Sequence, residues 1–241
     1  MAGVLDRQAV DRTSVFVLKV PIKSATILAD DVVVPDAIVD FATFREWSRA
    51  DGFPDRGRID YFSGRIWVDL GMEQAYIHNS VKKAFVICLE CFEEIGLGRL
   101  FTDGMRLVNA DAELSTEPDG SFLLYESLNS GKIREIPGKI EGCVEFEGSP
   151  DLMFEVVSAS STEKDFTELP DPYHRAGVGE FWRVDARLGE TRFELLRWSE
   201  QGYLPAEERD GWQHSLLFDK WFQLLRELDR RGNPRCRFSA R

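Results

Sequence analysis

The feature that most constrains this chain is an apolar stretch at residues 150–158, Pro-Asp-Leu-Met-Phe-Glu-Val-Val-Ser, which carries a carboxylate, Glu155, in its middle. A short run of this kind predicts a buried strand. Burying an ionised carboxylate costs several kcal/mol unless a cation or strong hydrogen-bond donors meet it. A second carboxylate, Asp119, stands at the edge of another predicted strand. We therefore expect the two carboxylates to share a cation, an arrangement typical of phosphoryl or hydrolytic chemistry.

The composition is that of a folded protein with an ample core. The chain has 241 residues, of which 43% are hydrophobic, and this length suits one large domain, or a domain with an added arm. No apolar stretch approaches the roughly 20 residues of a membrane span, and the N-terminus lacks a basic segment followed by an apolar one. Four cysteines do not indicate a disulfide scaffold. We expect a soluble, cytoplasmic protein with no membrane partner.

The charge is distributed unevenly. The net charge of −12 is unusual for a protein that binds DNA, because such proteins are commonly basic. Residues 226–241, however, contain six arginines and two acidic residues, a local charge of +4 that leaves −16 for the rest. This segment is either a solvated helix end and tail, or a tail that meets phosphate or an acidic partner.

The first part of the chain mixes helix and strand signals. Residues 1–35 predict an N-terminal arm or an extra strand, the strand lying over 14–20. Asp40 is a suitable N-cap for a helix. Residues 58–69 then predict two short strands joined by a tight turn.

The clearest predicted helix covers residues 74–96. Its apolar residues recur every three or four positions, at Ile77, Val81, Ala84, Cys88, Cys91 and Ile95. This stripe places Cys88 and Cys91 on the core face, which disfavours a redox or zinc role for them.

The remaining segments predict mostly strands. Strands are expected at about 99–108, 120–125, 151–157, 181–185 and 191–198. A polar connection is expected from 126 to 144, a short helix near 172–177, and a closing helix over 219–230. The whole chain predicts one mixed α/β domain.

A set of short motifs in a fixed order carries a family resemblance. In chain order they are residues 60–64, His78, 101–107, 117–119, 150–158, Asp165, Tyr173, 175–178 and 180–185. Together they resemble the PD-(D/E)XK nuclease superfamily, and more specifically its Uma-two family of restriction-endonuclease-like proteins. The resemblance implies a nuclease-like domain over residues 36–241. Its expected fold is a three-layer α/β, restriction-endonuclease-like core in which helices flank a central mixed β-sheet.

The resemblance also implies roles for particular residues. Asp119 and Glu155 would be metal ligands, with the backbone carbonyl of Val156 as a third. Mg²⁺, or Mn²⁺, suits carboxylate, carbonyl and water oxygens. Asp60 and His78 would face the same cleft, although a turn residue and a structural helix histidine are alternative interpretations.

The sequence departs from the superfamily pattern at the catalytic lysine. Val157 stands where the pattern has lysine, two positions after Glu155. The stretch after Asp165 also lacks lysine and contains two prolines, 170 and 172, which we expect to break a helix. Lys164 is the nearest substitute as a catalytic residue, and Lys82 or Lys83 could reach in from the long helix.

Two alternatives concern the carboxylate pair itself. Pro118-Asp119-Gly120 is also a strong turn signal, so Asp119 could be a turn residue instead of a ligand. Asp151 lies on the same face of its strand as Glu155, but four residues place it roughly 13 Å away. It either begins the strand or is the true partner of Glu155.

Three functions are compatible with these residues. The first is a metal-dependent endonuclease that hydrolyses DNA, binding it weakly and with strong dependence on salt. The second is a catalytically impaired relative that acts as a binding or assembly module, for example as a homodimer. The third is a metal hydrolase with another substrate, because a carboxylate pair does not name what is cleaved.

Overall fold

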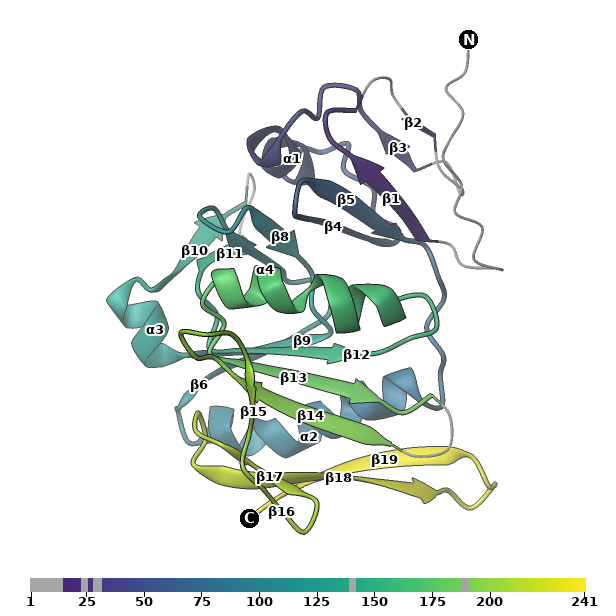
Figure 1. The fold of residues 1–241 in the computed structure, drawn as a ribbon, viewed down its shortest axis with the longest axis vertical. Helices are drawn as coiled ribbons and strands as arrows, with labels where there is room; N and C mark the ends of the chain where they lie inside the picture. The colour runs from purple at the N-terminus through teal and green to yellow at the C-terminus, as the bar shows by residue number, and fades with distance from the viewer. Residues whose placement is uncertain (1–14, 23–25, 28–31, 139–141, 188–190) are drawn as a thin grey trace.

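The computed structural model describes residues 15–22, 26–27, 32–138, 142–187 and 191–241. Most of the predicted N-terminal arm, including residues 1–14, therefore lies outside the described residues. The described part is a mixed α/β fold built on three larger β-sheets and a few helices (Figure 1). None of the described helices is long and apolar enough to cross a membrane.

A seven-stranded sheet forms the first layer. Its strands, in spatial order, are β1 (Val15–Lys19), β5 (Arg65–Asp69), β4 (Arg58–Phe62), β8 (Leu114–Thr116), β7 (Arg106–Asn109), β11 (Cys143–Gly148) and β10 (Ile133–Pro137). Its neighbouring strands are antiparallel, except for the parallel pair β7 and β11. The predicted two-stranded turn is the β4–β5 hairpin. The small pair β2 (Thr26–Ile27) and β3 (Val33–Val34) stands apart from this sheet.

A six-stranded mixed sheet carries the predicted strand with the internal carboxylate. Its spatial order is β15 (Leu204–Pro205), β14 (Arg192–Arg197), β13 (Glu180–Asp185), β12 (Leu152–Val156), β9 (Gly120–Leu124) and β6 (Gly98–Thr102). Strands β12 and β13 run parallel, and the other neighbours are antiparallel. β12 is central and fully buried, as its apolar sequence predicts.

Helices cover both faces of the six-stranded sheet (Figure 1). On one face, α2 (His78–Glu94) packs Phe85 against Phe154 of β12, with ring centroids 4.0 Å apart. On the other face, α4 (Pro170–Arg175) packs Tyr173 against Phe181 of β13. This arrangement, a mixed sheet between helical layers, is the fold class expected from the sequence.

Shorter elements complete the chain. Helix α1 (Phe41–Ser48) begins with the predicted N-cap, because the Asp40 side chain accepts a 2.9 Å bond from the Thr43 amide. The expected polar connection is more ordered than predicted, since α3 (Tyr125–Ser130), β10 and the start of β11 lie within it. A π-helical turn, η2 (Lys164–Glu168), precedes α4.

The predicted closing helix is wrong, because this segment is strand β18 (Lys220–Leu228). It belongs to a C-terminal sheet with β16 (Glu208–Arg209), β17 (Trp212–Ser215) and β19 (Pro234–Ala240). The apolar residues of β18 also fit a helical spacing, but only alternate ones, such as Phe222, face the core. Pairing with β19 along the whole strand decides in favour of extended structure.

Two further local predictions need correction. Cys91 is exposed and Cys88 only half-buried, because the buried stripe of α2 runs through Phe85, Leu89 and Phe92. Both cysteines are free thiols. The two prolines do not break a helix, since they lie in the first turn of α4, where a missing backbone N–H costs nothing.

Candidate active site

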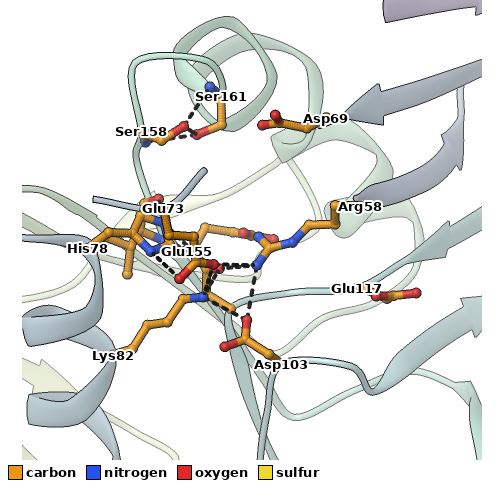
Figure 2. Close-up of polar contacts among 12 residues, drawn as sticks. Arg58, Asp69, Glu73, His78, Lys82, Asp103, Glu117, Glu155, Ser158 and Ser161 are labelled. Atoms are coloured by element: carbon orange, nitrogen blue, oxygen red, sulfur yellow. Dashed lines mark hydrogen bonds and ion pairs between the residues drawn. The ribbon is translucent and has the colours of Figure 1, made fainter. Parts of the chain in front are cut away.

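A pocket of about 370 Å³ opens at the end of β12, where the first turn of α2 and the start of β4 meet it. Its lining includes Arg58, Glu73, His78, Glu155 and Lys164. Figure 2 shows Arg58 approaching from one side of the site, with His78 and Lys82 of α2 approaching from the other. The alternation of β12 turns Phe154 toward α2 and Glu155 toward α4.

Asp119 lies just before β9 and is 1% exposed. Its Oδ2 accepts a 2.7 Å hydrogen bond from the backbone N–H of Val156, which ties it to the end of β12. Its Oδ1 lies 2.7 Å from Arg58 Nη2 and 3.2 Å from Lys82 Nζ. Burial alone would raise the pKa of this carboxyl, but Arg58, His78 and Lys82 hold it well below its usual range. Asp119 is therefore ionised at neutral pH.

Glu155 is equally buried, but it is neutral where Asp119 is ionised. Its Oε1 accepts a 2.6 Å hydrogen bond from the Tyr173 hydroxyl, and it forms no ion pair with any described residue. Burial, with help from the Asp119 and Asp165 carboxylates, outweighs the attraction of Lys164 and raises the pKa of Glu155 to about 8. The two carboxyl groups thus hold different protonation states at neutral pH, a pattern common in acid–base and metal sites.

His78, the first residue of α2, links the end of β12 to Asp119, which lies just before β9. Its Nε2 lies 2.9 Å from the Val156 carbonyl oxygen and 3.4 Å from Asp119 Oδ2, and its Nδ1 lies 3.4 Å from Glu73 Oε2. Burial lowers the pKa of the imidazole, but the Asp119 and Glu73 carboxylates prevail and raise it to about 9. The ring is then a cation at neutral pH, and Nε2–H donates to the carbonyl.

Lys164 lines the pocket, and Asp60 lies behind it as its ion-pair partner. The buried Lys164 Nζ donates to Asp60 Oδ2 at 3.1 Å and lies 4.0 Å from Asp165 Oδ1. The other oxygen of Asp60 accepts the Glu117 N–H at 3.0 Å. The acidic neighbours keep the pKa of Lys164 raised despite its burial. Lys164 is a fixed cation in the pocket wall.

Further residues complete this site, and one of them, Lys82, was expected from the sequence as a lysine that could reach in from the long helix. Lys82 contacts Glu73 at 2.5 Å and Asp103 at 2.7 Å in addition to Asp119, and Arg58 contacts Asp103 at 3.0 Å. Arg58 and Glu73 were not assigned to the site from the sequence, whereas Asp103 lies within the family motif at residues 101–107. Tyr173, a landmark of the family resemblance with no role assigned from the sequence, donates directly to Glu155.

Two candidates lie away from the pocket. Asp151 accepts hydrogen bonds from the Leu124 N–H, the Ser127 hydroxyl and Lys132, so it anchors the start of α3. Lys83 is exposed, and as the next residue of α2 it lies about 100° around the helix axis from Lys82.

The donors present fit a divalent cation. Asp119 Oδ1 is buried without a hydrogen-bond partner of suitable geometry, although two cations lie beside it. Glu155 and the Val156 carbonyl line the pocket next to it. Glu73, His78 and Asp119 also offer ligand atoms that all lie within 4.8 Å of one another. Both donor sets share Asp119 and offer the oxygen or imidazole ligands that divalent cations accept.

Two comparisons with known proteins find similarity to proteins described as nucleases. A family model, Uma2, described as "Putative restriction endonuclease", matches residues 41–227. The crystal structure of a "putative nuclease belonging to DUF820" from Anabaena variabilis ATCC 29413 superposes with a TM-score of 0.53 and 17% sequence identity. The match covers 75% of this chain and 91% of that one, and at this identity it speaks for the fold alone. No curated protein matches the sequence.

Proposed function

Because this chain belongs to the Uma2 family of restriction-endonuclease-like proteins, we propose that it is a metal-dependent endonuclease that hydrolyses DNA phosphodiester bonds. The observation that carries the proposal is the pair of buried carboxyl groups, Asp119 and Glu155. They are held together at the pocket by the bond from the Val156 N–H to Asp119. A homodimer and a cytoplasmic location stay predictions.

The residues of the pocket would have three roles: metal binding, phosphate contact and positioning of Asp119. Asp119, Glu155 and the Val156 carbonyl would hold Mg²⁺ or Mn²⁺, which polarises a phosphate and acidifies a bound water. Lys164 and Arg58 line the same pocket and place positive charge where a phosphate would enter. Lys164 takes the role of the motif lysine that Val157 cannot fill. His78 and Lys82 fix the ionised Asp119 in place.

One observation favours a second candidate, an impaired relative that binds without cleaving. Arg58, His78 and Lys82 already neutralise Asp119, so an incoming metal must compete with three cations of the protein itself. If that competition prevents metal binding, the chain retains the fold and the pocket but not the chemistry. This candidate predicts no cleavage with either metal.

Plasmid cleavage with Mg²⁺ or Mn²⁺ tests the proposal. We expect cleavage by the wild type and a loss of about a hundredfold or more in Asp119→Asn, Glu155→Gln and Lys164→Gln. Asp151→Asn and Lys83→Gln are matched controls, because they make the same kinds of substitution at a carboxyl group and a lysine outside the pocket, and both should stay active. Equal residual activity in all variants would point to a contaminating nuclease and contradict the proposal. Melting curves must show that each variant is folded.

A further inference from the structure

The C-terminal hairpin holds the only strong concentration of positive charge identified in this acidic sequence. Residues 226–241 carry +4, and the rest of the chain carries −16. Strands β18 and β19 pair from Phe222↔Ala240 to Leu228↔Pro234, and residues 229–233 form the turn. The segment is therefore a long two-stranded ribbon and not the end of a helix.

Alternation along the ribbon separates apolar from basic residues. Cys236 and Phe238 are buried on the inner face. Arg235 and Arg237 alternate with them and are exposed on the outer face. The turn adds two exposed arginines. We call the four exposed arginines the basic ribbon, which consists of Arg230, Arg231, Arg235 and Arg237.

Three of the four arginines of the basic ribbon form no ion pair within the part of the chain that the structure describes. Arg237 lies 3.3 Å from Glu227. The guanidinium groups of Arg230, Arg231 and Arg235 have no partner among the described residues. The one acidic group of the turn, Asp229, is committed to the backbone, because it accepts the N–H groups of Arg231 and Asn233 at 2.8 and 2.9 Å. Three arginines thus present free donors to solvent.

The ribbon is attached close to the candidate active site. The backbone N–H of Cys236 in β19 donates a 2.8 Å hydrogen bond to the Ser80 hydroxyl in the first turn of α2. Ser80 follows His78 by two residues. Figure 1 shows the turn between β18 and β19 on the same side of the molecule as the ends of β12 and β13. The free arginines therefore flank the side on which the pocket lies.

We propose that the basic ribbon binds the phosphate backbone of nucleic acid that reaches the pocket. The inference rests on the proposed function for its substrate. Arginine suits this task because its planar guanidinium donates two parallel hydrogen bonds to phosphate oxygens. A molecule whose remaining charge is −16 repels a polyanion, so a local cationic contact is needed beside the site. An acidic surface on a second copy of the chain is the competing partner, and the position of the ribbon favours nucleic acid.

The test is the salt dependence of DNA binding, measured by fluorescence anisotropy with a labelled duplex of mixed sequence in EDTA, so that no cleavage occurs. The ribbon variant is R230S/R231S/R235S. The matched control is R49S/R134S/R175S, which removes the same charge from exposed residues that do not line the pocket. We expect the ribbon variant to lose about three units of the slope of log K against log salt, and at least about tenfold in affinity at low salt. The control and R230K/R231K/R235K should keep the wild-type slope.

Three results would overturn the inference: no binding by the wild type, an unchanged slope in the ribbon variant, or an equal loss in the control. An altered monomer–dimer balance with an unchanged slope would assign the ribbon to a second copy of the chain. Because binding is measured without chemistry, failure of plasmid cleavage leaves this result intact. If the protein cleaves plasmid but the ribbon variant keeps the wild-type salt slope, the proposed function stands and the role of the ribbon is refuted.

Discussion

Asp119 and Glu155 show how neighbouring carboxyl groups acquire different charges from their surroundings. Arg58, His78 and Lys82 stabilise the Asp119 carboxylate, whereas within the described part of the chain Glu155 has only the Tyr173 hydroxyl as a direct partner. A metal that binds Glu155 must displace its proton, so metal affinity should rise with pH.

The free energy of unfolding should depend on pH through the ionisation of Glu155. Its pKa is about 8 in the folded protein against an ordinary value of 4.5, so between these values the folded state holds a proton that the unfolded state has lost. The free energy of unfolding then falls as pH rises through that window, by about 1.4 kcal/mol per pH unit for one proton. Glu155→Gln removes this contribution but can still accept from Tyr173. Urea unfolding in EDTA at several values between pH 5 and 7 measures the difference in slope.

The variant itself is the control for all other groups, including Asp165, whose raised pKa of about 6 acts in the same direction. We compare slopes rather than single stabilities, so that contributions shared by both proteins cancel. Parallel pH profiles for the wild type and Glu155→Gln would show that Glu155 ionises normally in the fold, contrary to this account.

At the residue scale, the sequence located six side chains or backbone groups that the fold brings to one pocket region: Asp60, His78, Asp119, Glu155, Val156 and Lys164. Each stands in or beside a recognisable strand or motif. Arg58 and Glu73 could not be found in this way, because only the contacts of Arg58 with Glu73 and with Asp103, which are made across distant segments, bring them to the site.

At the scale of elements, β12 could be predicted because its apolar run has no competing helical interpretation. The segment of β18 could not, since its apolar residues fit both a helix and a strand, and only its partner β19 decides. The prolines of α4 show the same limit, because their effect depends on their position in the helix.

The contact between α2 and β12 should contribute strongly to the stability of the fold around the site. Phe85 stacks on Phe154, the residue directly before Glu155, so the pair fixes the strand that presents the carboxyl group. Phe85→Ala should lower the free energy of unfolding by about 3–5 kcal/mol through lost burial and a cavity. Ile87→Ala, on the exposed side of the same helix, should change it by less than about 0.5 kcal/mol. Urea denaturation at a fixed pH compares them. Equal losses in the two variants would contradict a special role for this contact.

At the scale of the molecule, the layered α/β class followed from the order of motifs, but the division into three larger sheets did not. The strand order places β8 beside β4 and β13 beside β12, pairings between distant segments that no local pattern specifies. The charge distribution was visible in the sequence, and its meaning changed once the basic segment proved to be a ribbon anchored near α2.

Direct measurement of metal binding tests the central claim, that Asp119 and Glu155 hold a divalent cation. Mn²⁺ titrated into the protein at pH 8 should fill one site, detected by the loss of the free-ion electron paramagnetic resonance signal. Asp119→Asn and Glu155→Gln should each abolish it, whereas Asp151→Asn should keep it. Absence of binding in the wild type would contradict the claim. So would binding that survives Glu155→Gln but is lost in Glu73→Gln, because the cation would then belong to Glu73, His78 and Asp119.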